Sequence, residues 1–276
     1  MSSKELQTGH PPLPGTASNA ETAGKGFYDR VYGEPGYASS EEAAQHHEFT
    51  ALSRFVRDFG LESCECLEVG SGRGAFQNMV SRYTGVDVSE SVARYYTKPF
   101  YTASAEQLPF DNHRFDALWS ITVLEHVPNP EQALAEMRRV LRPGGMLYLR
   151  PAWNCRPWIC EGIPVRPYRD LSLRQKLTKA SLPVRDSLWF RAVQKLPVRL
   201  LRSLRFDHAK PIALKFRRLD PDYSRFWMAD SDACCSLDPF DVIQWFRSRG
   251  DEVVSHPSWA SAMLSRSEAL IVRIGG

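Results

Sequence analysis

Long hydrophobic runs and paired cysteine motifs are both missing from this sequence of 276 residues. No apolar stretch approaches the roughly 18 residues that a membrane-spanning helix requires, and the first residues carry no apolar segment typical of a secretory signal. The six cysteines include no C-x-x-C pair, the spacing that most often marks a zinc site. We therefore expect a cytoplasmic protein with reduced thiols and without a bound metal.

Charge of ordinary amount, 24% of the residues, is unevenly distributed along the chain. The net charge is +3, but residues 151–218 contain 16 Lys or Arg and four Asp or Glu, a net of +12, which leaves −9 for the remainder. A basic segment of this kind suits an anionic partner. No recognised nucleic-acid-binding module accompanies it, which disfavours nucleic acid as that partner.

Strand and helix patterns alternate along most of the chain. A short apolar run at 64–69 ends in the glycine-rich turn 70–74, and a helical pattern over 75–83 leads to a second strand at 84–88. Further patterns predict the elements that follow. The strands are expected at 99–103, 115–121, 146–149, 253–254 and 269–274, and the helices at 41–59, 90–96, 131–141 and 238–249. Such alternation predicts a parallel sheet.

The unit around the glycine turn is typical of a site for an adenosine-bearing ligand. Gly70 and Gly72 allow close approach of the ligand to the backbone, and Asp87 ends the second strand where a carboxylate accepts hydrogen bonds from ribose hydroxyls. The same spacing fits a nicotinamide dinucleotide. Glu68, two residues before the turn, argues against it, because a carboxylate repels a pyrophosphate and suits a ligand with a cationic end.

Several further motifs make the chain resemble the class I S-adenosylmethionine-dependent methyltransferases, in particular the methyltransferase type 11 group. They occur in the order and spacing of that family: Leu67–Gly74, Gly85–Ser89, Leu108–Phe110, Leu124–His126 and Arg139–Gly145. The resemblance covers 60–150 strongly and 238–274 by pattern, and it does not extend to 151–237. It implies an α/β fold: a Rossmann-like, doubly wound, seven-stranded sheet of order 3-2-1-4-5-7-6, with the last strand antiparallel and a helical insert between strands five and six.

The resemblance also implies S-adenosylmethionine as cofactor and a set of residues around it. Glu68 would place the methionine ammonium, and Asp87, with Val88 beside it, would bind the ribose. The remaining candidates are Gly70 and Gly72 at the backbone approach, Ser104 and Ala105 at the adenine, Ser120 at the methionine portion, and Tyr28 at the cofactor mouth. Ser104 stands where the family commonly has aspartate. Tyr28 has an alternative role, as an anchor that packs the N-terminal segment onto the domain.

The acceptor side is less defined. His126 follows strand four and is a candidate general base, or else a structural histidine that bonds a neighbouring carbonyl. Trp153 and Trp158 follow strand five and would line an acceptor pocket, or else cap the core. The basic segment that follows reads as helices broken at Pro183 and Pro197, with arginines beside large apolar residues, as in an interfacial helix.

Three interpretations of the segment 151–237 stay open: a helical cap with some substrate contact, a surface that lies on an anionic membrane, and a lid that selects an anionic substrate. We expect a disordered tail at 1–26, a cofactor domain formed by 27–150 and 238–276, and methyl transfer to a small or medium-sized acceptor, with oxygen or nitrogen favoured. The alternatives are a lipid-like acceptor at an anionic membrane, an NAD(P)-dependent oxidoreductase, and a catalytically inactive binding protein. No oligomeric state is predicted.

Overall fold

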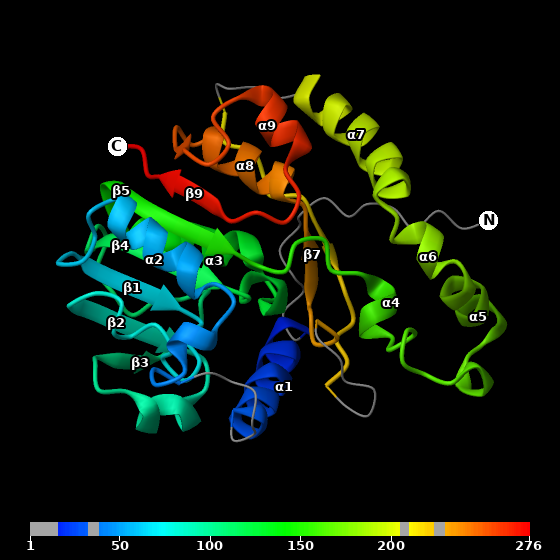
Figure 1. Ribbon diagram of the computed structural model, residues 1–276, viewed down its shortest axis with the longest axis horizontal. Coiled ribbons are helices and arrows are strands. Elements are labelled where there is room, and N and C mark those ends of the chain that lie inside the picture. Colours follow the sequence, from blue (N-terminus) through cyan, green and yellow to red (C-terminus); the bar gives the residue numbers. More distant parts are fainter. Residues whose placement is uncertain (1–15, 33–38, 205–209, 224–229) are drawn as a thin grey trace.

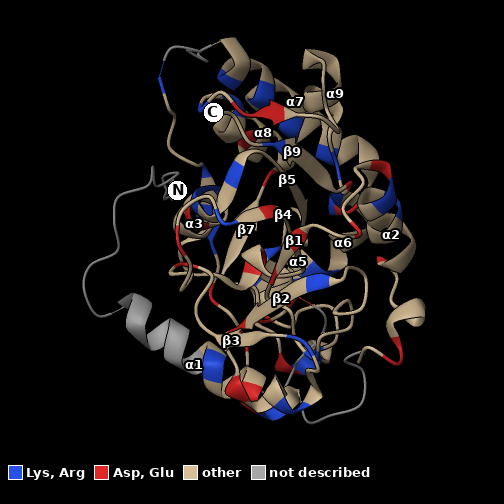
Figure 2. Ribbon diagram, turned by 90° about the vertical axis from the view of Figure 1, so that its left-hand side faces the viewer, with Lys and Arg blue, Asp and Glu red and all other residues tan. Residues whose placement is uncertain are grey.

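A computed structural model describes residues 16–32, 39–204, 210–223 and 230–276 (Figure 1). The described part of the chain contains a seven-stranded sheet of order β3-β2-β1-β4-β5-β9-β8, which Figure 2 shows from β9 at the top to β3 at the bottom. Its strands are β1 (Glu65–Val69), β2 (Arg82–Asp87), β3 (Phe100–Thr102), β4 (Phe115–Ile121), β5 (Leu141–Arg150), β8 (Glu252–Val253) and β9 (Leu270–Arg273).

The strands pair in both directions. β1 to β5 pair in parallel, and β9 runs antiparallel to both β5 and β8. The connection between β8 and β9 spans residues 254–269 and contains the helix α9 (Trp259–Leu264). The predicted α/β sheet, its strand order and its antiparallel last strand are confirmed.

Two separate cores lie on the two faces of the sheet. The helix α2 (Phe49–Asp58) covers one face, where Phe55 packs with Cys66, Trp119 and Tyr148. These side chains alternate along their strands with those of the other face, as the pleat requires. On that other face, Leu67 and Leu147 pack against α3 (Pro130–Val140) and α8 (Pro239–Arg247).

The predicted helix at 75–83 is wrong. Between β1 and β2 the chain forms consecutive turns, in which Gly74 N bonds Ser71 O and Gln77 N bonds Gly74 O. The buried Gln77 side chain holds this conformation, because its Nε2 donates to Tyr95 O at 3.0 Å and its Oε1 accepts from Thr97 N at 2.8 Å. Tertiary hydrogen bonds thus override a helical sequence pattern.

Other predicted helices are shorter than expected. The segment 41–59 begins with the 3₁₀ turn η1 (Ala43–Gln45) and becomes helical only in α2. The segment 90–96 is the 3₁₀ helix η2 (Glu90–Tyr95).

At the N-terminus, residues 16–26 of the expected tail lie within the helix α1 (Thr16–Val31), and residues 1–15 fall outside the described residues.

The segment 151–237 contains helices and a small second sheet. Its elements are α4 (Pro157–Cys160), η4 (Tyr168–Asp170), α5 (Leu173–Ala180), α6 (Leu182–Arg185), α7 (Leu188–Leu204), β6 (Phe216–Arg218) and β7 (Cys235–Leu237). β6 and β7 pair antiparallel, and β7 lies against the turn η3 (Leu124–His126). α5 to α7 run along one edge of the molecule, on the side toward which the carboxyl ends of β1 and β4 point (Figure 1). We retain the division into a cofactor domain and a cap as a proposal.

The helix α7 does not break at Pro197, contrary to expectation. It continues from Leu188 to Leu204, although proline lacks the N–H that would bond the preceding turn. Pro197 is exposed, so water can reach the carbonyl that is left unbonded. None of the described helices is long and apolar enough to cross a membrane.

Candidate functional site

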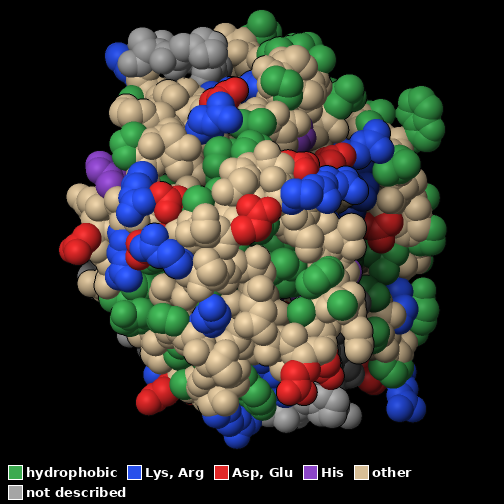
Figure 3. All heavy atoms as spheres, turned by 60° about the vertical axis from the view of Figure 1, so that its left-hand side comes forward, with side chains coloured by type: hydrophobic (Ala, Val, Ile, Leu, Met, Phe, Trp, Pro, Cys, Tyr) green, Lys and Arg blue, Asp and Glu red, His purple; other side chains and the backbone are tan. Residues whose placement is uncertain are grey.

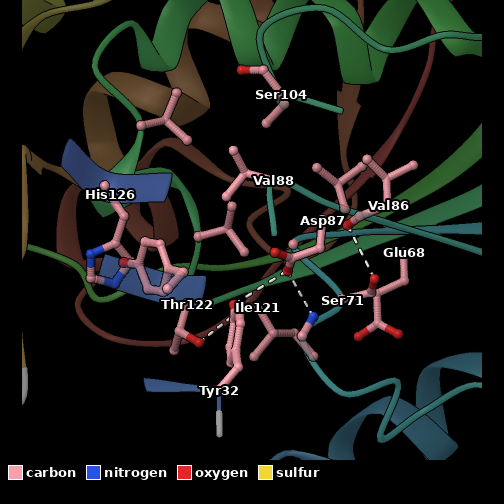
Figure 4. Close-up of a pocket in the computed structure, with 18 of the residues that line it drawn as sticks. Tyr32, Glu68, Ser71, Val86, Asp87, Val88, Ser104, Ile121, Thr122 and His126 are labelled. Carbon is pink, nitrogen blue, oxygen red and sulfur yellow. Dashed lines mark hydrogen bonds between the residues drawn. The ribbon is translucent and has the colours of Figure 1, made fainter. Parts of the chain in front are cut away.

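A cavity of about 460 Å³ lies at the carboxyl ends of β1, β2 and β4 (Figure 4). This is where open α/β sheets bind their ligands. Most of the residues singled out from the sequence line it together: Tyr28, Glu68, Gly70, Gly72, Asp87, Val88, Ser104, Ala105 and His126. Ser120, Trp153 and Trp158 do not.

Asp87 is held at the end of β2 by donors from three parts of the chain. Its Oδ2 accepts from Gly72 N at 2.8 Å and from the Tyr32 hydroxyl at 3.3 Å, and its Oδ1 accepts from Ser89 N at 3.0 Å. Burial raises the pKa of Asp87, and the bonds from Ser89 and Gly72 oppose that rise. The carboxylate is therefore fixed in orientation at the wall of the cavity.

Glu68 lies in the same cavity and is almost fully buried, with 4% of its surface exposed. Burial raises its pKa to about 8, the hydrogen bond from Tyr83 opposes the rise, and the nearby charge of Asp87 adds to it. The Tyr83 hydroxyl donates to Glu68 Oε2 at 2.5 Å. A cation next to this carboxyl would favour its charged form and lower the pKa again.

Gly70 and Gly72 are required by geometry. Gly70 has φ +73°, and a Cβ at that position would lie 2.1 Å from Cγ2 of Val123, in the loop that follows β4. Gly72 has φ +49° and faces the ring of Tyr32. Positive φ is accessible to glycine at little cost. The turn can therefore pack directly on the β4 loop and still present its backbone N–H to Asp87.

His126 lies in the turn η3 and contacts an acid from a distant part of the chain. Its Nδ1 lies 3.3 Å from Oδ2 of Asp232 and also 3.3 Å from the Asp232 carbonyl. The Tyr28 hydroxyl donates to the same Oδ2 at 2.7 Å. The Nε2 of His126 lies 3.8 Å from Oε1 of Glu125, a buried group whose pKa is raised by burial.

The lining residues that the sequence did not point to include two acids, Asp230 and Asp232. Asp232 reaches the cavity because Cys234 N donates to Glu125 O at 2.7 Å, which joins the residues before β7 to η3. Asp230 adopts a positive φ of 65°, and burial raises its pKa. No local motif marks either acid, since both belong to the segment without a family resemblance. Tyr32, four residues after Tyr28, also lines the cavity, but nothing in the sequence indicated its bond to Asp87.

The structure places the three other candidates elsewhere. Ser120 is buried one residue behind Ile121 and Thr122, which line the cavity in its place. Trp153 packs against the core and donates its Nε1 to Glu268 O at 2.9 Å. Trp158 lies beneath Arg156 and Arg185 and lines a second cavity, of about 690 Å³, against α5.

Residues 67–149, 83 of the 276 residues, match the family model described as a methyltransferase domain. The phthiotriol/phenolphthiotriol dimycocerosates methyltransferase of Mycobacterium tuberculosis is 32% identical over 153 residues, which are 50% of this chain and 56% of that protein. The sterol 24-C-methyltransferase of Pneumocystis carinii is 31% identical over 130 residues, 41% of this chain and 33% of that protein.

The chain spans about half the length of the first of these relatives and a third of the second. Among solved structures, a SAM-dependent methyltransferase from Thermotoga maritima is 28% identical, with a TM-score of 0.37 over 47% of this chain and 62% of that one. The matches to the M. tuberculosis and P. carinii proteins thus extend over half of this chain or less.

Proposed function

We propose that this protein transfers the methyl group of S-adenosylmethionine to an acceptor bound on the His126 side of the cavity. The observation that carries the proposal is the position of Asp87 and Glu68 in one cavity, beside a turn in which Gly70 leaves no room for a Cβ. The match of residues 67–149 to a methyltransferase domain supports the same activity and disfavours the oxidoreductase alternative.

Each end of the cofactor has a suitable group in the cavity. Asp87 would accept hydrogen bonds from the ribose hydroxyls, and the Tyr32 hydroxyl, its longest contact at 3.3 Å, is the donor that a ribose would most readily displace. Glu68 would balance the positive charge of the methionine portion. Ser104 and Ala105 would border the adenine. The bound sulfonium supplies an already activated methyl group, so the protein mainly provides proximity and alignment.

The acceptor side offers a base. In the tautomer with a proton on Nδ1, His126 donates toward Asp232 and keeps Nε2 free to accept a proton. Nε2 would take the proton of the acceptor hydroxyl or amine as the methyl group passes to the acceptor, and the sulfur of the cofactor would keep the electron pair of the broken methyl–sulfur bond, which gives S-adenosylhomocysteine. Asp232 would then act as a positioning residue, because it fixes the tautomer and stabilises the resulting imidazolium. This arrangement favours a hydroxyl or amine acceptor.

A lipid-like acceptor is a second candidate within the same activity. The relatives from M. tuberculosis and P. carinii carry names that refer to phthiotriol dimycocerosates and to a sterol. The segment 151–237 of this chain carries many exposed large apolar side chains, which suits a protein that collects an apolar molecule.

A turnover assay tests the proposal. The protein is incubated with S-adenosylmethionine labelled in its methyl group, together with either a lipid extract or a pool of water-soluble alcohols and amines. We expect label in an acceptor of one pool and equal formation of S-adenosylhomocysteine. Label that stays on the cofactor in both pools, despite demonstrated cofactor binding, would favour the inactive binding protein instead.

A further inference from the structure

The helix α7 has its charged side facing inward. Lys195, Arg199 and Arg202 recur at helical spacing and point toward the rest of the protein. Arg199 is 4% exposed and bonds Asp238 Oδ1 at 2.5 Å and the carbonyls of Met263 and Ser265 at 2.6 and 2.9 Å. Lys195 lies 3.4 Å from Asp238, and Arg202 pairs with Asp241. The ion pairs thus attach α7 to the helices α8 and α9.

The opposite side of α7 faces outward and is mostly apolar, with the exposed Gln194 at its margin. The residues at helical spacing there are Trp189, Val193, Leu196, Pro197, Leu200, Leu201 and Leu204, all of them exposed. Trp189 and Leu204 are 83% and 75% exposed. A helix on the surface of a water-soluble protein normally has the reverse arrangement. The sequence pattern of α7 is therefore amphipathic, but its apolar side is left without a partner in the described structure.

Exposed apolar residues are also found on α5 and α6. Leu173 and Leu177 on α5, which line the second cavity, and Val184 on α6 are exposed, and together with the outward side of α7 they form what we call the α5–α7 face. Exposed apolar areas of this extent mark contact with a protein or a membrane. The face lies along one edge of the molecule (Figure 1).

Basic residues flank the α5–α7 face. Residues 165–204 contain ten Lys or Arg and two Asp or Glu. Three of the ten, Lys195, Arg199 and Arg202, pair inward with Asp238 and Asp241, so seven basic and two acidic residues remain, a net charge of +5. Arg169 and Arg174 are exposed beside Leu173. Elsewhere basic side chains adjoin acids: Glu65 pairs with Arg82 and Arg114, and basic and acidic side chains lie next to each other on the face in Figure 3. An apolar helix side with basic flanks is typical of an interfacial helix on anionic lipid.

We propose that the α5–α7 face docks on the surface of an anionic bilayer, with Trp189, Val193 and Leu201 among the acyl chains near the headgroups. A second copy of this chain is a poorer occupant, because the basic flanks of the two copies would repel each other. The helices would lie on the membrane, since none of those described can span it. Docking extends the proposed function, to which it adds access to a lipid-like acceptor, but it does not require turnover.

Vesicle co-sedimentation tests the docking. The protein is mixed with vesicles of phosphatidylcholine alone or with added phosphatidylserine, at low and high salt. We expect binding to the anionic vesicles that weakens with salt. The double variant Trp189→Ser/Leu201→Ser should lose roughly tenfold or more in vesicle affinity, because each substitution removes a large apolar side chain that docking would bury in the bilayer. The matched control is Tyr101→Ser, an exposed apolar residue on the distant edge strand β3, which should bind as the wild type does.

Two further measurements separate the explanations. S-adenosylhomocysteine binding should be the same in the double variant and the wild type. Wild-type protein that binds the cofactor product and ignores anionic vesicles would overturn the docking and leave the proposed function intact. Wild-type protein that binds anionic vesicles but not S-adenosylhomocysteine would support the docking and overturn the proposed function. A dimer in light scattering that the double variant abolishes, without vesicle binding by the wild type, would assign the face to a second copy and overturn the docking.

Discussion

The imidazole Nδ1 of His126 lies 3.3 Å from the carboxylate Oδ2 of Asp232, a residue 106 positions further along the chain. His126 belongs to the matched methyltransferase domain, and Asp232 comes from the segment outside it. The contact therefore brings Asp232, from the segment 151–237 that has no family resemblance, next to the candidate base.

Replacement of that carboxylate should impair methyl transfer but not cofactor binding. In Asp232→Asn the amide no longer stabilises a protonated His126, so we expect kcat to fall by roughly 10²-fold or more. The loss should fall on kcat and leave S-adenosylhomocysteine affinity unchanged, which a collapse of the site would not do. Asp220→Asn, an exposed residue of the same segment, is the control. An unchanged kcat in Asp232→Asn would remove the positioning role.

Cofactor affinity should depend on pH through Glu68. The pKa of its carboxyl is raised to about 8 in the free protein by burial. A cationic ligand binds the deprotonated form, so the affinity for S-adenosylmethionine should increase as the pH rises toward 8, by up to about tenfold per pH unit. Glu68→Gln should bind more weakly and lose this dependence. Titration calorimetry between pH 6 and 8 would measure it, and a flat profile in the wild type would contradict the assignment.

The same carboxyl should influence the stability of the free protein in the opposite direction. Its folded pKa, about 8, exceeds the ordinary value of 4.5, so its contribution to stability is full below pH 4.5 and is lost as the pH rises toward 8. Within that window the wild type should lose about 1.4 kcal/mol per pH unit relative to Glu68→Gln. Urea unfolding at several pH values checks this, with the exposed Glu62→Gln as control. Parallel curves for wild type and Glu68→Gln would refute it.

The glycine turn gives a test with an internal reference. Gly70 and Gly144 have φ of +73° and +79°, but a Cβ would clash with Val123 only at Gly70. Gly144→Ala should cost about 1 kcal/mol of unfolding free energy from φ alone, and Gly70→Ala about 2–4 kcal/mol because the clash adds to it. The added Val123→Ala should restore part of that loss. Equal costs at the two glycines would mean that the turn and the β4 loop are not packed as described.

The fold and the cofactor side of the cavity were predictable because their signals are local. The first two strands, the glycine turn and Asp87 lie within 26 residues, and burial on both faces of the sheet makes such strands read as short apolar runs. The helix expected at 75–83 failed because the Gln77 side chain bonds residues 95–97, a contact that no local pattern reports.

The acceptor side was not predictable for a related reason. Asp230 and Asp232 reach the cavity only through the pairing of the residues before β7 with η3, and their sequence neighbours carry no motif. The arginines beside large apolar residues likewise indicated an interfacial helix in this segment, but composition alone cannot tell which side of α7 faces the protein. The orientation of α7 depends on its ion pairs with Asp238, which precedes α8, and Asp241, which lies on α8.

Calorimetric titration with S-adenosylhomocysteine, and separately with NADH, would show whether the cavity beside Asp87 binds S-adenosylmethionine. We expect the wild type to bind S-adenosylhomocysteine and not NADH. Asp87→Ala should weaken the binding of S-adenosylhomocysteine by about 1–3 kcal/mol, as for lost hydrogen bonds to a charged group. Binding of NADH alone, or binding of S-adenosylhomocysteine that is indifferent to Asp87→Ala, would contradict it.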